Sequence, residues 1–183
     1  LNATVIAGLL AGSLGAQAQT NLVQNPTFAG GSFASWNANG SYGAYYEGTY
    51  VNSDVAYLGW YDGIAMWQDT GATFQSGVSY ELAVTAQVSQ GTIGDLTLSL
   101  QDPTIGWAVV ASGDAAFANP TFSGAASPSL WETLTLNVTA SQLNSALSSA
   151  GGSVGDHLAV GIALLNTDSN AYAWIQSVSL VAT

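Results

Sequence analysis

Lysine and arginine are missing from this chain of 183 residues, whereas aspartate and glutamate together number 11. The formal net charge is therefore -11, and His157 is the one side chain that can become a cation near neutral pH. Side-chain salt bridges are excluded unless His157 is protonated. Nucleic acid is excluded as a partner because no group can neutralise phosphates. Anionic membrane surfaces are disfavoured for the same reason, so no membrane partner is expected for the mature protein.

Cysteine is also absent, which excludes disulfides and thiol chemistry. The single histidine, His157, stands beside Asp156, but no nucleophile-elbow pattern accompanies this pair. Glu47, Glu81 and Glu132 could supply the paired carboxylates of a glycosidase, yet any acidic chain offers such combinations. We therefore expect a protein that is not an enzyme and has no catalytic residues.

Aspartates in or near expected turns could surround a hard cation such as Ca²⁺. No EF-hand spacing or repeated calcium motif accompanies them. A solvated turn carboxylate is the better interpretation for each one individually, so we expect no cofactor and no specific metal site, only weak attraction of Ca²⁺. The residues concerned are Asp54, Asp62, Asp69, Asp95, Asp102, Asp114 and Asp168.

Aromatic residues, by contrast, are abundant, with 6 Trp, 8 Tyr and 5 Phe. Segments with alternating apolar and polar residues, such as SYELAVTAQVS, DLTLSLQ and LWETLTLNV, predict strands with one buried face. About eight to ten strands at this spacing favour an all-β sandwich or jelly roll. The expected strands include residues 42–51, 55–60, 64–69, 79–89, 95–101, 130–138, 157–165 and 171–183.

One short helix is predicted over residues 140–150. Thr139 and Gln142 have the spacing of a capping box, and Gly151-Gly152 supplies the stop. Leu143 and Leu147 follow the helical period and form the expected buried face.

Residues 1–20 carry no charge and form a segment separate from the sandwich domain expected over residues 21–183. Ala16-Gln17-Ala18 matches the cleavage pattern of a secretion signal, and the apolar stretch is too short to span a bilayer. A removed export signal is the first interpretation. The alternative is a retained arm that donates a strand to a neighbouring copy and so builds a filament. The apolar residues of this assembly arm are Val5, Ile6, Leu9, Leu10 and Leu14.

A run of aromatic residues between positions 42 and 67 is the best candidate for ligand recognition. Sugar rings stack their C–H faces on Trp or Tyr, while nearby carboxylates and amides bind hydroxyl groups. Alternation buries about half of these rings, so only some are available to a ligand. We predict sugar contacts from Tyr46, Trp60 and Tyr61.

Four segments resemble, in order, the jelly-roll, galactose-binding-like carbohydrate-binding modules. They are NLVQNPTFAGGSFASW (residues 21–36), MWQDTGATFQSGVSYELAVTAQV (residues 66–88), LWETLTLNVTA (residues 130–140) and WIQSVSLVAT (residues 174–183). The resemblance covers nearly everything from Asn21 onward and implies a jelly-roll fold. Ala29 and Gln176-Ser177 replace the acidic residues that commonly hold a structural calcium in those modules, so we expect that site to be absent.

The same layout is similar to bacterial exported proteins of the PEP-CTERM type, a family associated with extracellular polysaccharide and biofilm matrix. Together these features favour a secreted, non-enzymatic structural protein of an extracellular matrix or filament, whose partners are copies of itself joined through the assembly arm. The alternative is a monomeric carbohydrate-binding module whose exposed Trp and Tyr side chains bind extracellular polysaccharide.

Overall fold

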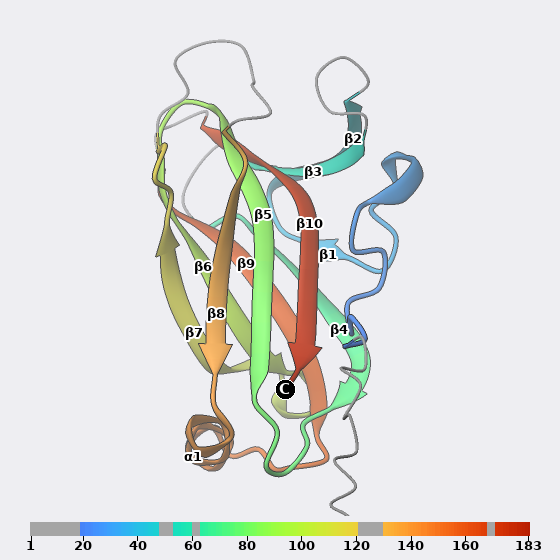
Figure 1. Ribbon diagram of the computed structural model, residues 1–183, viewed down its shortest axis with the longest axis vertical. Helices are drawn as coiled ribbons and strands as arrows, with labels where there is room; N and C mark the ends of the chain where they lie inside the picture. Colours follow the sequence, from blue (N-terminus) through green and yellow to red (C-terminus); the bar gives the residue numbers. More distant parts are fainter. Residues whose placement is uncertain (1–18, 48–52, 60–62, 121–129, 168–170) are drawn as a thin grey trace, which may run out of the picture.

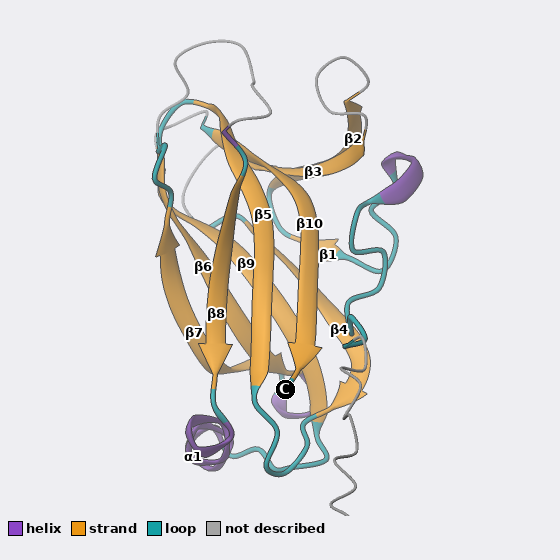
Figure 2. Ribbon diagram, viewed as in Figure 1, coloured by secondary structure: helices purple, strands orange, loops and turns teal. Residues whose placement is uncertain are grey.

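The computed structural model describes residues 19–47, 53–59, 63–120, 130–167 and 171–183. Within these residues, ten strands form two five-stranded antiparallel sheets that pack face to face (Figures 1 and 2). Sheet 1 has the order β1-β4-β9-β6-β7, and sheet 2 has the order β2-β3-β10-β5-β8. The predicted all-β jelly-roll sandwich is confirmed.

The elements largely follow the sequence patterns. Sheet 1 consists of β1 (Asn37–Ala38), β4 (Ala65–Thr73), β9 (His157–Thr167), β6 (Ile93–Asp102) and β7 (Ala108–Ala116). Sheet 2 consists of β2 (Ser41–Glu47), β3 (Ser53–Gly59), β10 (Tyr172–Ala182), β5 (Tyr80–Gln90) and β8 (Glu132–Val138). The helical elements are η1 (Ala29–Gly31), η2 (Pro103–Ile105) and α1 (Ala140–Ala150). Strands β1 and β7 were not among the expected strands.

The core lies between the sheets and is built from alternate strand residues, as strand geometry requires. In β5 the buried residues include Leu82 and Val84, while Glu81 and Ala83, which alternate with them, are only partly buried. In β6 the core residues are Leu96, Leu98 and Leu100, all fully buried. Each sheet therefore has an outer face that does not contribute to this core.

Helix α1 lies across one end of the sandwich (Figure 1). The Thr139 side chain accepts a hydrogen bond from Gln142 N while the Gln142 side chain accepts one from Thr139 N, so the predicted capping box is confirmed. Gly151, with φ +84°, ends the helix in the left-handed conformation that favours glycine. Leu143 and Leu147 are buried and fix the helix to the core.

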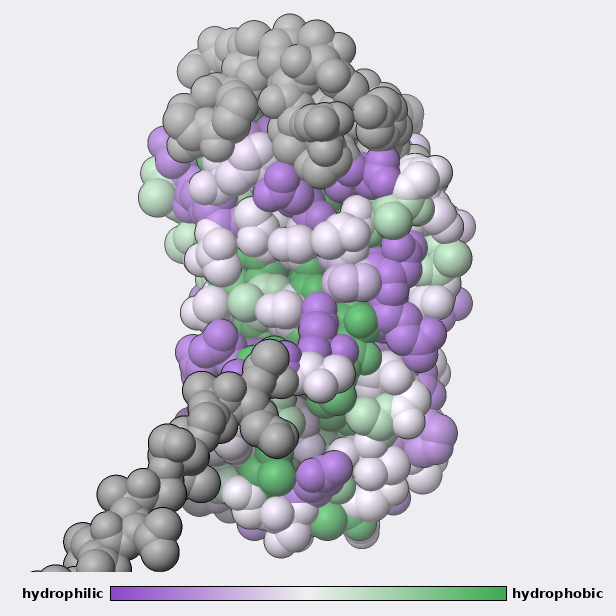
Figure 3. All heavy atoms as spheres, turned by 45° about the vertical axis from the view of Figure 1, so that its right-hand side comes forward, coloured by the Kyte–Doolittle hydropathy of each residue, from purple (hydrophilic) through white to green (hydrophobic). Residues whose placement is uncertain are grey.

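The segment that follows residue 20 joins the two sheets along one edge of the sandwich (Figure 1, blue). Leu22 N donates to Leu180 O of β10 at 2.8 Å, and Gln24 N donates to Gln68 Oε1 of β4 at 2.6 Å. Gln68 Nε2 donates back to Gln24 O at 2.9 Å, which satisfies the amide of a fully buried side chain. Figure 3 looks onto this edge and shows small apolar groups among hydrophilic ones.

Phe28 anchors the same segment in the core. Its side chain is fully buried, and its ring centroid lies 5.8 Å from that of Trp36 and 6.2 Å from that of Phe33. The residues of the first segment that resembles carbohydrate-binding modules therefore have a structural task, which is to close the edge between the two sheets.

Candidate functional site

Trp67 projects from the outer face of sheet 1. Its neighbours along β4, Met66 and Gln68, are buried, whereas Trp67 is only partly buried. Residues directly opposite each other in antiparallel strands share a face. The pairing therefore places Trp67, Gly161, Ser99 and Ser112 in one row across β4, β9, β6 and β7.

Strand β9 supplies a low floor in the middle of this face. Its outward residues include Ala159, Gly161 and Ala163, which have the smallest side chains available. A Cβ atom placed on Gly161 would collide with the Gln101 amide and would lie 2.5 Å from Ser99 Oγ. Gln101 Nε2 in turn donates to Ser99 Oγ at 3.0 Å. The Gln101 amide therefore lies over Gly161 of β9, where only a glycine leaves room for it.

Trp107 reaches the same face from the connection between β6 and β7. Asp102 holds this connection, since its Oδ1 accepts from Thr104 N at 2.8 Å and its carbonyl accepts from Trp107 N at 2.9 Å. Gly106 and Trp107 both have positive φ, +77° and +66°, and this conformation is uncommon for a bulky residue. The turn therefore holds an aromatic side chain that is 37% exposed.

Trp67 and Trp107 meet edge to face. Their ring centroids are 6.4 Å apart, and the ring planes meet at 70°. Because β9 lies between β4 and β6, the pair spans β9. This position agrees with the complete burial of Ala159, which faces outward in the row next to Trp67. We call this arrangement, with the Gln101 amide beside it, the tryptophan corner.

An ion pair borders the tryptophan corner. His157 Nδ1 lies 3.0 Å from Asp69 Oδ2, and Asp69 is two residues from Trp67 on the same outer face. His157 N also donates to Thr104 Oγ1 at 2.9 Å, which ties the pair to the turn that carries Trp107. The two tryptophans are thus linked through hydrogen bonds as well as through ring contact.

The two members of the ion pair shift each other's pKa in opposite directions. The hydrogen bond to Asp69 and the charges of Asp69, Asp102 and Asp156 raise the pKa of His157 above its ordinary value. Partial burial of Asp69 acts to raise the pKa of its carboxyl group, but the hydrogen bonds from His157 and Gly71 N outweigh it and the pKa is lowered. The ion pair therefore stabilises the fold above the unfolded-state pKa of aspartate and below that of histidine, which are about 3.8 and 6.5.

We expect Asp69→Asn to lower the pKa of His157, because the strongest contact that favours the imidazolium is then lost. The measurement is an NMR titration of the imidazole protons, which belong to the only histidine in the chain. Glu81→Gln, on the outer face of sheet 2, removes an equal charge and should leave the pKa of His157 unchanged. An unaltered His157 titration in Asp69→Asn would show that the ion pair does not form in solution.

Three other acidic residues singled out in the sequence have local partners. Glu132 accepts from Ala118 N at 2.7 Å and from Asn119 N at 2.8 Å, which fixes the chain after β7. Asp54 accepts from Gly30 N, and Asp114 Oδ1 accepts from Thr97 Oγ1 at 2.7 Å. In the part of the chain that the structure describes, no three His, Cys, Asp or Glu side chains gather as metal ligands.

The site residues predicted from sequence lie largely outside the described residues. Trp60, Tyr61 and the whole assembly arm (Val5, Ile6, Leu9, Leu10 and Leu14) fall there, as do Asp62 and Asp168. Tyr46 lies in β2 opposite Asp54, but its side chain is not described. Of the aromatic run, Trp67 takes part in the tryptophan corner. Trp107 was missed, because it stands alone in the sequence and reaches Trp67 only through the fold.

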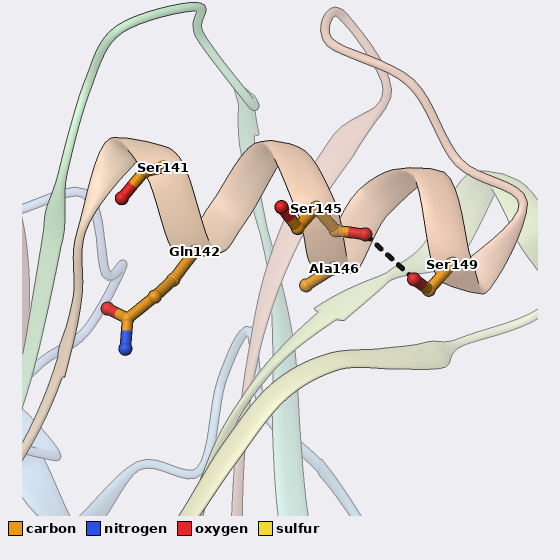
Figure 4. Close-up of a pocket in the computed structure, with 5 residues that line it drawn as sticks. All are labelled: Ser141, Gln142, Ser145, Ala146 and Ser149. Carbon is orange, nitrogen blue, oxygen red and sulfur yellow. Dashed lines mark hydrogen bonds between the residues drawn. The ribbon is translucent and has the colours of Figure 1, made fainter.

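Two other surface features are weaker candidates for a ligand-binding site than the tryptophan corner. A hollow on α1 is lined by Ser141, Gln142, Ser145, Ala146 and Ser149 (Figure 4), but Ser149 Oγ donates to Ser145 O at 2.9 Å and so bonds within its own helix. The hollow has no aromatic lining. The Gln87 amide, which faces outward from β5, is 1% exposed and therefore beyond the reach of a ligand.

Comparison with known proteins shows the fold. No protein-family model and no curated protein matches the chain. Among solved structures, it is similar to TmCBM61 in complex with β-1,4-galactotriose, with a TM-score of 0.58 and 13% identity over 90% of this chain and 99% of that one. The chain has the fold of a jelly-roll carbohydrate-binding module. At this identity the likeness concerns the fold alone.

Two further solved structures have the same fold. A family 16 carbohydrate-binding module has a TM-score of 0.58 and 16% identity, over 88% of this chain and 99% of that one. The CBM22-1 xylan-binding domain of Paenibacillus barcinonensis Xyn10C has a TM-score of 0.57 and 13% identity, over 91% of this chain and 97% of that one. None of the helices in the described segments is long and apolar enough to cross a membrane.

Proposed function

We propose that this protein is a non-catalytic carbohydrate-binding module that binds extracellular polysaccharide at the tryptophan corner. The observation that carries the proposal is the pair of ring planes, at 70° and 6.4 Å, held over a floor of alanine and glycine. The ring faces can stack against the C–H face of a sugar, while the Gln101 amide and nearby hydroxyl groups bind its hydroxyls. Because Ala159 and Gly161 are already buried, the sugar would stack on the exposed side of the rings, where Trp107 is 37% exposed.

The solved structures with the same fold support this class of ligand. One was solved with β-1,4-galactotriose, and another is described as a xylan-binding domain. A third, at a TM-score of 0.52 and 11% identity, is described as specific for non-crystalline cellulose. Rings set at 70° cannot form the flat platform that a crystalline surface requires, so the tryptophan corner suits a single glycan chain.

The proposal is tested by affinity electrophoresis in native gels that contain β-1,4-galactan, xylan or hydroxyethylcellulose. We expect the protein to migrate more slowly in at least one of these gels than in a gel without polysaccharide. An acidic protein of similar size that binds no sugar corrects for the sieving effect of the polymer. Unchanged migration in all three gels would contradict the proposal.

Further parts of the proposed function rest on residues outside the described ones. Trp60 and Tyr61, together with Tyr46 of β2, stay proposed sugar contacts beside the tryptophan corner. Export from a bacterium, as in proteins of the PEP-CTERM type, and assembly into a matrix or filament through the assembly arm also stay proposals. Carbohydrate binding has the stronger support, because the neighbouring folds favour it and the tryptophan corner gives it a site.

A further inference from the structure

The face that carries the tryptophan corner is acidic. Asp69, Asp95 and Asp114 project from the outer face of sheet 1, since each pairs in register with an outward-facing residue of a neighbouring strand. Asp114 is exposed, and Asp69 is partly exposed beside Trp67. A ligand that stacks on the two tryptophans therefore lies beside Asp69 and on the same face as Asp114.

No lysine or arginine balances these charges, and His157 can balance only that of Asp69. The chain has no lysine or arginine, and its single histidine already gives its Nδ1 to Asp69. Recognition of an anionic sugar in proteins uses arginine, lysine or backbone N–H groups at its carboxylate. Carboxylate and amide oxygens instead accept hydrogen bonds from uncharged hydroxyl groups, which neutral sugars supply in number.

From this charge pattern, and on the basis of the proposed function, we propose that the tryptophan corner selects neutral glycan chains and rejects those that carry uronic acids. Asp114 is the specificity-determining residue of this face, because it is exposed and has no cationic partner, so it repels a second carboxylate brought to the face. Repulsion between exposed charges a few ångströms apart weakens binding about fivefold or more at low salt. It falls as ionic strength rises, because salt screens charges over about 8 Å.

The test compares acidic polysaccharides with neutral counterparts. Polygalacturonate is set against its carboxyl-reduced product, and glucuronoxylan against xylan freed of its glucuronate branches, by isothermal titration calorimetry in EDTA. EDTA removes divalent cations that could bridge two carboxylates. Where a pair binds, we expect its neutral member to bind at least about fivefold more tightly than its acidic member in low salt. This difference in affinity should shrink in about 0.5 M NaCl.

The possible results distinguish failure of the charge selectivity from failure of carbohydrate binding itself. Equal or tighter binding of the acidic member overturns the charge selectivity and leaves carbohydrate binding standing. Binding of no member of either pair, together with unchanged migration in all the neutral gels, overturns the binding proposal and the selectivity with it.

One substitution tests whether Asp114 causes the preference for neutral glycans. Asp114→Asn keeps an acceptor for Thr97 Oγ1 but removes the charge, so it should narrow the difference between the neutral and the acidic member of a pair. Glu81→Gln is the matched control, because it removes one charge from the outer face of sheet 2 and should leave the difference unchanged. An equal effect of both variants would show that net charge, and not the face of sheet 1, sets the preference.

Discussion

Replacing Trp107 by alanine should weaken polysaccharide binding by at least about thirtyfold, which corresponds to about 2 kcal/mol, the loss that marks a hot-spot residue. Trp67→Ala should cause a similar loss. Each ring forms one side of the corner, at 6.4 Å from the other, so the loss of either removes a stacking surface and opens the corner to water. The measurement is the dissociation constant for the polysaccharide that binds the unaltered protein best.

Two control variants test whether the loss of binding is specific to Trp67 and Trp107. Trp174→Ala removes a partly buried tryptophan from the outer face of sheet 2 and should leave binding within about twofold of the original. Trp60→Ala tests the sugar contacts predicted from sequence, and a loss there in addition to the loss in Trp107→Ala would extend the site toward residues 60–61. Full binding by both Trp67→Ala and Trp107→Ala would exclude the tryptophan corner as the site.

Phe28→Ala should destabilise the fold by about 3 to 5 kcal/mol, the usual cost of truncating a fully buried phenylalanine. Natural domains are stable by about 5 to 15 kcal/mol, so this is a large share of the total. Alanine keeps the same backbone preference at this left-handed position, where φ is +52°, and the loss therefore reports packing against Phe33 and Trp36.

The measurement is the free energy of unfolding in urea, followed by tryptophan fluorescence. Phe33→Ala is the matched control, because Phe33 is only partly buried and its removal should cost less than about 2 kcal/mol. A loss below about 1 kcal/mol in Phe28→Ala would show that the segment after residue 20 does not close the edge of the sandwich in solution.

The architecture could be predicted because its signals are local. Alternation marks β5, β6 and β8, and the capping box of Thr139 and Gln142 fixes where α1 begins. Strand β7 was missed because its sequence, AVVASGDAA, is rich in alanine and also holds Gly113 and Asp114, residue types that are uncommon in strands. Its conformation comes from pairing with β6, a contact that no local pattern reports.

The site was harder to predict from the sequence, because its residues are far apart in the chain. The density of aromatic residues drew attention to residues 42–67, and Trp67 does line the described face. Trp107 is 40 positions further along, and its place depends on the turn held by Asp102 and on the bond from His157 N to Thr104. His157 and Asp69, in turn, are 88 positions apart and meet only because β9 pairs with β4.

The most direct test of the tryptophan corner is an NMR titration of the indole N–H signals of the six tryptophans with the bound glycan. Trp67→Phe and Trp107→Phe assign the two signals that matter. We predict that the Trp67 and Trp107 signals shift most and saturate together at the dissociation constant. Unchanged signals for both, with saturable shifts of other tryptophans, would place the ligand elsewhere and contradict the account.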